Sequence, residues 1–328
     1  MTDNLLLRIG DSGDAVRDIQ RRLTRLGFDV GADAPGSFGS ATDAAVREFQ
    51  EQRGLRLDGI CGPQTWGALV EASFRLGDRL LYLRAPMLRG DDVSELQEHL
   101  GALGFDAGKV DGIIGPRTVS ALEEFQRNAG LTVDGICGPA VVAALKRVVR
   151  PASSSSPVAS VRETQQLLDA PRRLLGRRIG VGETGGLAAL ADAVGRELVE
   201  AGAIVAVLHH PDESVQATEA NSFKAEAFLS LALSAERGCS TAFYAARAFE
   251  SIGGRQLAQL VLDEIDPVVF APSNSPTGMQ LPILRETRMA AVVCEMGPPG
   301  LVVEHTAELS KSLTRAVARW AREPVNPE

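Results

Sequence analysis

The sequence is poor in aromatic residues, in paired cysteines and in positive charge. Aromatic side chains make up 5% of its 328 residues, and its four cysteines form no Cys-x-x-Cys pair, so neither a zinc knuckle nor a disulfide framework is indicated. Its 34 lysines and arginines stand against 42 aspartates and glutamates, which gives a formal charge of -8. Nucleic acids and anionic membranes bind basic surfaces, so this balance argues against both as partners.

Long apolar segments are missing as well. No stretch approaches the roughly 20 apolar residues of a membrane-spanning helix. The beginning of the chain contains Asp3 and a run of only three leucines, whereas a secretory signal has a basic start and an apolar run of roughly 7–15 residues. These absences predict a cytoplasmic protein.

An internal repeat fills the first half of the chain. The hexapeptide 58–63, Asp-Gly-Ile-Cys-Gly-Pro, returns unchanged at 134–139. The apolar spacing within each copy predicts three short helices, and a Pro/Ser-rich stretch follows the second copy. We therefore predict an all-α first module at 1–75, a second at 76–149 and a linker at 150–172. Further matched segments are 13–16 with 90–93, 26–28 with 103–105, and 49–50 with 125–126.

After residue 172 the pattern changes to alternating strands and helices. Apolar stripes at helical spacing lie between these runs, at 187–198, 256–265 and 308–320. This alternation predicts an α/β domain with a mainly parallel sheet at 173–328. The predicted strands are the short apolar runs at 178–181, 203–208, 228–233, 241–244 and 290–294.

Three cysteines lie in apolar surroundings. Cys61 and Cys137 occupy equivalent positions of the repeat, and Cys294 lies within an apolar run. Cysteine often serves as a small hydrophobic residue, so we predict that all three are buried and unreactive.

The repeat resembles the peptidoglycan-binding module that occurs beside cell-wall hydrolases. Both copies carry Gly-Asp-x-Val, Ile/Leu-Gln, Leu-Gly-Phe, Phe-Gln and Leu-x-x-Asp-Gly-x-x-Gly. The resemblance makes Asp58, Asp111 and Asp134 candidate binding residues, with Trp66 as a candidate surface for a sugar ring. Turn formation and core packing are the alternative roles of these residues. The first copy has Pro35 where the second has Asp111.

The remaining part resembles the zinc-dependent N-acetylmuramoyl-L-alanine amidase family. A glycine-rich turn follows the first predicted strand, Ala220-Asn221 precedes the third, and the segment 289–297, Met-Ala-Ala-Val-Val-Cys-Glu-Met-Gly, is similar to the late strand that carries the family's catalytic glutamate. The resemblance implies an amidase-like α/β fold in which two histidines and a glutamate hold zinc and leave one position for water.

The residues at those zinc positions differ from the family pattern. Thr184 stands where the first histidine is expected and Ala232 where the second is, while Glu183 is the candidate for the glutamate ligand. Without a metal-activated water, Glu295 is a candidate relic or structural carboxylate, and we predict no catalytic residue and no metal. We predict that the histidines elsewhere are exposed or turn residues, namely His99, His209, His210 and His305.

Two such modules before an amidase domain without zinc histidines resemble a group of actinobacterial amidase-like proteins. The resemblance implies a non-catalytic cytoplasmic regulator of peptidoglycan precursor synthesis that has no cofactor. The UDP-N-acetylglucosamine enolpyruvyl transferase is then the implied protein partner, with a muramyl peptide as a further ligand. One alternative is an active zinc amidase with an altered metal site. The other is a cytoplasmic sensor that binds muramyl-peptide precursors through the repeats.

Overall fold

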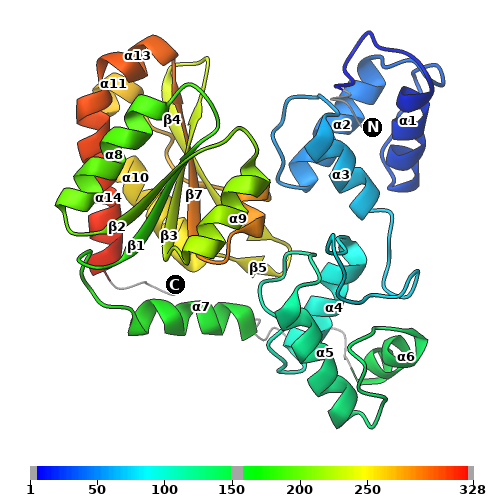
Figure 1. The fold of residues 1–328 in the computed structure, drawn as a ribbon. Helices are drawn as coiled ribbons and strands as arrows, with labels where there is room; N and C mark the ends of the chain where they lie inside the picture. Colours follow the sequence, from blue (N-terminus) through cyan, green and yellow to red (C-terminus); the bar gives the residue numbers. More distant parts are fainter. Residues whose placement is uncertain (1–5, 149–157, 324–328) are drawn as a thin grey trace. The chain divides into compact units, whose positions relative to one another are not determined.

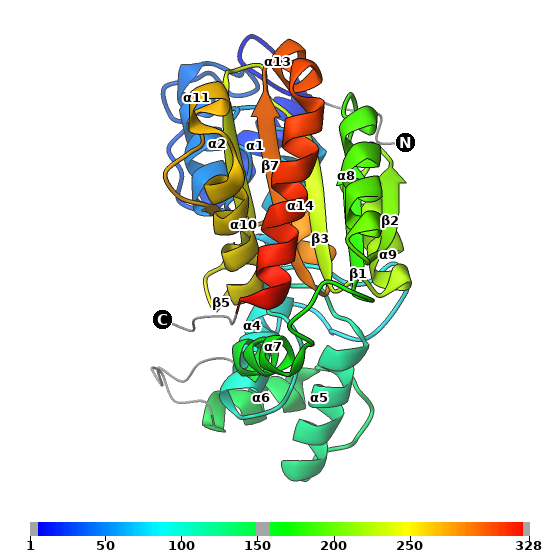
Figure 2. The same ribbon diagram turned by 90° about the vertical axis from the view of Figure 1, so that its left-hand side faces the viewer.

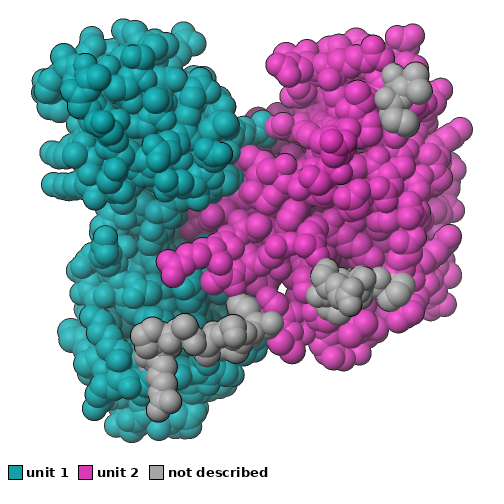
Figure 3. Space-filling model, turned by 180° about the vertical axis from the view of Figure 1, so that it is seen from behind, with its two compact units in different colours: residues 1–159 teal, residues 160–328 magenta. Residues whose placement is uncertain are grey.

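The computed structural model of the chain describes residues 6–148 and 158–323. The chain forms two compact units, residues 1–159 and residues 160–328, which Figure 3 colours separately. Each unit buries its own apolar core. No helix within the two described ranges is long and apolar enough to cross a membrane.

Each repeat of the first unit folds into three helices, as the apolar spacing predicts (Figure 1). In the first helix, Val16, Ile19 and Leu23 lie on one face and are fully buried. Two β-bridges join distant segments in each copy, Leu7 with Cys61 and Ser12 with Ser37 in the first, and Leu81 with Cys137 and Arg89 with Ile113 in the second. The helices are α1 (Asp14–Arg25), α2 (Ser40–Gln52) and α3 (Pro63–Glu71) in the first module, and α4 (Asp91–Ala102), α5 (Pro116–Asn128) and α6 (Pro139–Val148) in the second.

The burial predicted for the cysteines is confirmed. Cys61 and Cys137 are each 1% exposed at equivalent places in the two module cores, and Cys294 is fully buried in the second unit. All four cysteines are free thiols. Burial raises the pKa of the Cys61, Cys137 and Cys239 thiols to about 12, and it raises the pKa of Cys294 well above its usual value.

We expect the native thiols to resist modification. At about pH 8, a soluble disulfide reagent should label less than one thiol per native chain within minutes, because the reactive thiolate is nearly absent and the sulfur atoms are covered. The same reagent in concentrated guanidinium chloride should label all four cysteines. Rapid labelling of a whole thiol in the native chain would contradict this expectation.

The second unit is built on a mainly parallel sheet, as predicted. The strand order is β2-β1-β3-β7-β4-β5, with β6 paired to β4. The β1–β2, β1–β3, β3–β7 and β4–β6 pairs are parallel, and β4 runs antiparallel to β7 and β5. The strands are β1 (Arg178–Glu183), β2 (Ile204–His209), β3 (Ala227–Leu233), β4 (Gly238–Ala246), β5 (Phe249–Glu250), β6 (Thr277–Met279) and β7 (Ala290–Gly297).

Helices cover both faces of this sheet. Figures 1 and 2 show α8 (Ala188–Glu200), α10 (Ile252–Glu264) and α14 (Thr306–Arg322) on one face, and α9 (Glu213–Phe223) on the other. The apolar stripes of the first three helices meet the strands in one continuous core. Because both faces are covered, the central strands read as continuous apolar runs. Shorter helices complete the unit, namely α11 (Pro267–Phe270), α12 (Pro282–Glu286) and α13 (Pro299–Glu304).

The segment 150–172, predicted as a linker, contains a helix. Its first part, up to residue 157, lies outside the described residues, but α7 (Val158–Asp169) follows. Glu163 accepts a hydrogen bond from the Ser251 hydroxyl at 2.6 Å and one from Gly253 N at 3.3 Å, at the start of α10. Leu167 packs against the core of the second unit. A carboxylate is favourable at a helix N-terminus, so these contacts make α7 a part of the second unit.

Candidate functional site

Three parallel strands of the second unit end at one edge of its sheet. The register pairs Glu183 of β1 with Leu231 of β3, and Ala232 of β3 with Glu295 of β7. Thr184 follows Glu183 directly. The structure therefore places the positions predicted from the sequence, Thr184, Ala232 and Glu295, along one edge. In open parallel α/β sheets, ligands bind at the edge formed by the carboxyl ends of the strands.

Glu183 is buried at this edge, and its carboxylate is fully engaged. One oxygen, Oε2, accepts hydrogen bonds from Gly185 N at 2.8 Å and from Leu187 N at 3.2 Å. The other oxygen, Oε1, lies 3.2 Å from Nδ1 of His209. A buried carboxylate is costly unless it is hydrogen-bonded, and here its partners are the glycine turn and the start of α8. Glu183 thus holds the turn that leads into α8.

Sequence reasoning missed the place of His209. The predicted exposure of His209 is confirmed, but the prediction did not include its two carboxylate neighbours, Glu183 at Nδ1 and Asp192 of α8 at Nε2, each 3.2 Å away. Its side chain is 40% exposed. The signal that could have located it is the parallel pairing of β1 with β2, which sets His209 opposite Glu183.

The other histidines have separate surroundings. His210 accepts a hydrogen bond from Asp212 N in the turn after β2. His305 meets the ring of Phe270 edge-on, with 6.1 Å between ring centroids. His99 lies on α4 in the first unit.

The donor set at this edge does not fit zinc. Zinc in proteins is held by imidazole, thiolate and carboxylate groups, and three protein ligands are the usual minimum. Thr184 and Ala232 offer neither imidazole nor thiolate, and the carboxylate of Glu183, which precedes Thr184, is bound to two backbone N–H groups and faces His209. Among the described residues, no group of three or more His, Cys, Asp or Glu side chains is arranged to hold a metal ion.

Apolar packing fills part of the same edge. A carbon atom added at Gly186 would lie 2.7 Å from Leu233 Cδ1, so the leucine at the end of β3 packs directly against the glycine turn. Glu295 is half-buried in β7, where the register sets it between Ala232 of β3 and Ser240 of β4. Leu233 and the Glu183 carboxylate, which accepts hydrogen bonds from the glycine turn, thus occupy the region where the family resemblance would place ligands.

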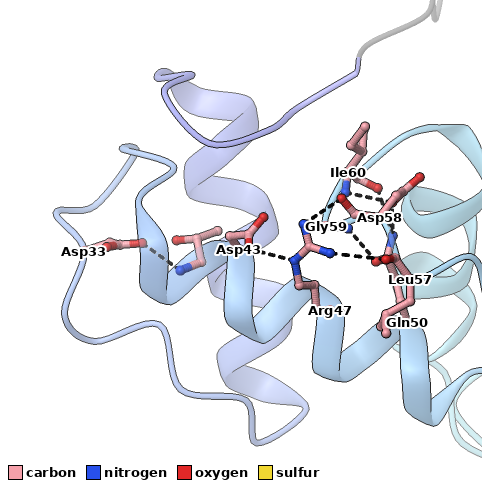
Figure 4. A network of polar contacts seen from close by, with 9 residues as sticks. Asp33, Asp43, Arg47, Gln50, Leu57, Asp58, Gly59 and Ile60 are labelled. Atoms are coloured by element: carbon pink, nitrogen blue, oxygen red, sulfur yellow. Dashed lines mark hydrogen bonds and ion pairs between the residues drawn. The ribbon is translucent and has the colours of Figure 1, made fainter. Parts of the chain in front are cut away.

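The candidate aspartates of the modules hold turns together with buried glutamines, and Figure 4 shows Asp58 and Gln50 of the first module. Asp58 Oδ1 accepts hydrogen bonds from Gln50 Nε2 at 2.7 Å and from Ile60 N at 2.8 Å. In return, Gln50 Oε1 accepts the Gly59 N–H at 2.9 Å. The glutamine side chain therefore satisfies both sides of the Asp-Gly turn.

The same clamp recurs in the second module. Gln97 and Gln126 donate to Oδ1 of Asp111 and Asp134, at 2.9 and 2.7 Å. The hydrogen bonds from Ile136 N and from Gln126 lower the pKa of Asp134. Sequence reasoning left a binding role and a turn role open for these aspartates. The structure gives each of them a turn contact, and the Gln of the repeated Phe-Gln and Leu-Gln motifs is the signal for it.

An arginine reinforces the Asp58 turn in the first module. Arg47 donates to Asp43 Oδ2 at 2.8 Å, to Leu57 O at 3.2 Å and to Asp58 O at 2.9 Å, as Figure 4 shows. The hydrogen bond to Asp43 raises the pKa of Arg47. The equivalent residue of the second module is Glu123. The two modules therefore present differently charged surfaces beside the same turn.

The loop of the first module that lacks an aspartate at position 35 uses Asp33 instead. Asp33 Oδ2 accepts hydrogen bonds from Gly39 N at 3.0 Å and Thr42 N at 2.7 Å, at the start of α2. Burial by itself would raise the pKa of Asp33, but the hydrogen bonds from Thr42, Ala41 and Gly39 outweigh it and lower the pKa. This carboxylate caps the helix from the loop.

Trp66 is half-buried against the first module's core. The Arg22 guanidinium lies 5.2 Å from the centroid of its ring. Packing and a cation–π contact therefore account for this side chain, and the arginine covers one face that a sugar would use.

Comparison with known proteins agrees with this architecture. The family model of a peptidoglycan binding domain matches residues 12–69 and 89–145. The chain is similar to the N-acetylmuramoyl-L-alanine amidase CwlM of Mycobacterium tuberculosis (strain ATCC 25618 / H37Rv), with 35% identity over 90% of this chain and 82% of the relative. It is also similar to the N-acetylmuramoyl-L-alanine amidase CwlL of Bacillus licheniformis, with 34% identity over 39% of this chain and 41% of the relative.

Among solved structures, the catalytic domain of the N-acetylmuramoyl-L-alanine amidase CwlV from Bacillus (Paenibacillus) polymyxa var. colistinus matches 44% of this chain and 97% of its own length. The sequence identity is 15% and the TM-score is 0.36.

Proposed function

The chain belongs to the family of amidase-like proteins with peptidoglycan-binding modules that includes CwlM, and from this membership we propose that it regulates peptidoglycan precursor synthesis by binding, without hydrolysing an amide bond. In this proposal the modules and the amidase-like unit present binding surfaces, and the fold of an enzyme is kept as a scaffold.

The observation that carries the proposal is the chemistry of the sheet edge. Hydrolysis of an amide by this fold requires a water molecule activated by a bound metal, and Thr184 and Ala232 supply no ligand for one. The Glu183 carboxylate accepts a hydrogen bond from the glycine turn and contacts His209. Glu295 on its own could accept a proton, but among the described residues no group of three or more His, Cys, Asp or Glu side chains is arranged to hold a metal ion that would acidify water.

The location and the partner follow from the same proposal. A regulator of precursor synthesis works in the cytoplasm, where soluble precursors are made. We propose that its protein partner is an enzyme of that route, with the UDP-N-acetylglucosamine enolpyruvyl transferase as the first to test. Elution of the full chain together with the purified transferase in size-exclusion chromatography would support this partner, and separate elution at micromolar concentrations of both would reject it.

We expect the purified full chain to carry no stoichiometric zinc and to release no peptide from a muramyl-L-alanyl peptide. Zinc is measured by elemental analysis after purification with and without added zinc, and peptide release is measured by mass spectrometry. An amidase that has all three zinc ligands, prepared in parallel, is the positive control. One zinc ion per chain together with peptide release would overturn the proposal in favour of an active amidase with an altered metal site.

A further inference from the structure

A cavity of about 290 Å³ lies on the surface of the second module. It is formed by the loop after α4 and by the first two turns of α5. Its walls combine one guanidinium, two carboxylates and one hydroxyl with the apolar surface of Pro116 and Ala121. The lining residues are Asp106, Pro116, Arg117, Ser120, Ala121 and Glu124.

The polar side chains that α5 contributes to this cavity have no partner among the described residues. Arg117, Ser120 and Glu124 are exposed, and within the described ranges they make no hydrogen bond or ion pair. Their spacing of three and four residues places them on one face of the helix. A carbon atom added at Gly108 would lie 3.5 Å from Arg117 Cβ, so the stem of the arginine rests on the loop. The Arg117 guanidinium and the Glu124 carboxylate are thus both available to a ligand in this cavity.

The first module provides an internal comparison, because α2 and α5 match at an offset of 76 residues. Ala41 and Ala44 stand where the second module has Arg117 and Ser120, whereas Glu48 matches Glu124. The cation and the hydroxyl are therefore specific to the second module.

The start of the helix differs in the same way. In the first module the Asp33 carboxylate binds the N–H groups of Gly39 and Thr42 at the start of α2. At α5 the N-cap residue is Gly115, which has no side chain to cap the helix, and a carbon atom added there would meet no atom within 4 Å. In the first module the Asp33 carboxylate thus occupies the position at the start of the helix. In the second module the equivalent position is open and lies beside Arg117.

We propose that this cavity binds the end of a short peptide that carries both a carboxylate and a free amine. Arg117 pairs with the carboxylate and Glu124 with the amine. Asp106, whose Oδ1 accepts a hydrogen bond from Gly108 N at 3.1 Å, adds negative charge to the same wall. The volume of the cavity is at the small end of the range for ligand pockets, which suits the end of a peptide better than a disaccharide. No aromatic side chain lines it, so a sugar ring has no surface on which to stack. This inference rests on the proposed function, in which the peptide belongs to a peptidoglycan precursor.

The test is isothermal titration of the full chain with a synthetic muramyl pentapeptide whose third residue is a diamino acid. We expect Arg117→Ala to weaken binding at least about tenfold and Glu124→Gln about threefold or more, since each removes one charge that meets the ligand. Glu48→Gln, the same change at the equivalent position of the first module, should change the affinity less than about twofold. All three side chains are exposed, so the variants should fold.

Modified peptides separate the two charge contacts. Acetylation of the free amine should weaken binding to the wild-type chain but not to Glu124→Gln. Replacement of the C-terminal carboxylate by an amide should weaken binding to the wild-type chain but not to Arg117→Ala. Absence of binding by the wild type, or binding that Arg117→Ala and Glu124→Gln leave unchanged, would overturn this inference. The proposed function is judged separately by zinc content, peptide release and partner elution, so either proposal can fail without the other.

Discussion

Replacing Gln50 by alanine should destabilise the first module by roughly 3 kcal/mol. The glutamine side chain is 1% exposed, and it donates to Asp58 Oδ1, to Ile60 O and to the Thr65 hydroxyl. Its carbonyl oxygen accepts the buried N–H of Gly59. Alanine would leave the buried Gly59 N–H without this partner, would remove one hydrogen bond each from Asp58, Ile60 O and Thr65, and would open a void beneath the turn. Because a domain of this size has only about 5–10 kcal/mol of stability, the loss is a large fraction of the total.

Gln52 supplies the matched control for this change. It lies two residues further along α2, is exposed, and donates a hydrogen bond to Glu48 Oε1 at 3.4 Å. Gln52→Ala should therefore change stability by less than about 0.5 kcal/mol. Hydrogen exchange of the Gly59 and Ile60 amides in the full chain reports directly on the stability of this turn of the first module. Exchange in Gln50→Ala that is no faster than in Gln52→Ala would show that the clamp does not hold the turn.

Hydrogen exchange is also needed to interpret any loss of ligand affinity that a substitution at an Asp-Gly turn causes. Asp58 is exposed, and the loss of its carboxylate removes one acceptor from the Gln50 clamp. If Asp58→Ala weakens ligand binding, exchange at Gly59 must be checked first, because a loosened turn would alter any neighbouring surface. A loss of affinity with unchanged exchange would point to a direct contact.

Much of the fold could be predicted from local patterns. The stripe of Val16, Ile19 and Leu23 has the period of a helix, and duplication repeats it in the second module, so one prediction serves both copies. The runs at 228–233 and 290–294 are apolar throughout, as expected for strands covered on both faces, and they become β3 and β7. These signals depend on a few neighbouring residues.

The features that the sequence did not reveal depend on contacts between distant segments. His209 lies beside Glu183 only because β1 and β2 pair in parallel, which a single sequence does not specify. Glu163 falls in a stretch that reads as a linker, and its role appears only when Ser251 at the start of α10 comes into contact with it. The composition of the cavity on α5 was visible, but its shape depends on how the loop at Gly108 folds back onto Arg117.

A second large effect is expected at the end of β7. A methyl group added at Gly297 would overlap Ser234 O and lie 2.7 Å from Glu236 O, and both atoms belong to the backbone of the β3–β4 connection. That connection is tied to β7, because Ser234 N donates to Met296 O at 2.9 Å. Relief of the overlap therefore requires the connection to move away from the strand. We expect Gly297→Ala to cost on the order of 3 kcal/mol or more.

Gly300 makes the comparison decisive, since it lies three residues later, in α13, and an added methyl group there meets nothing within 4 Å. Alanine favours a helix over glycine, so Gly300→Ala should be neutral or stabilising by up to about 1 kcal/mol. In calorimetry of the full chain, the transition of the second unit should fall by roughly 6–12 °C in Gly297→Ala and should not fall in Gly300→Ala. Equal transition temperatures for the two variants would mean that the β3–β4 connection moves away from the strand without a measurable loss of stability. The sheet edge beside Glu295 would then be soft enough to rearrange around a ligand, and the packing of Leu233 on the glycine turn would no longer argue against an open site there.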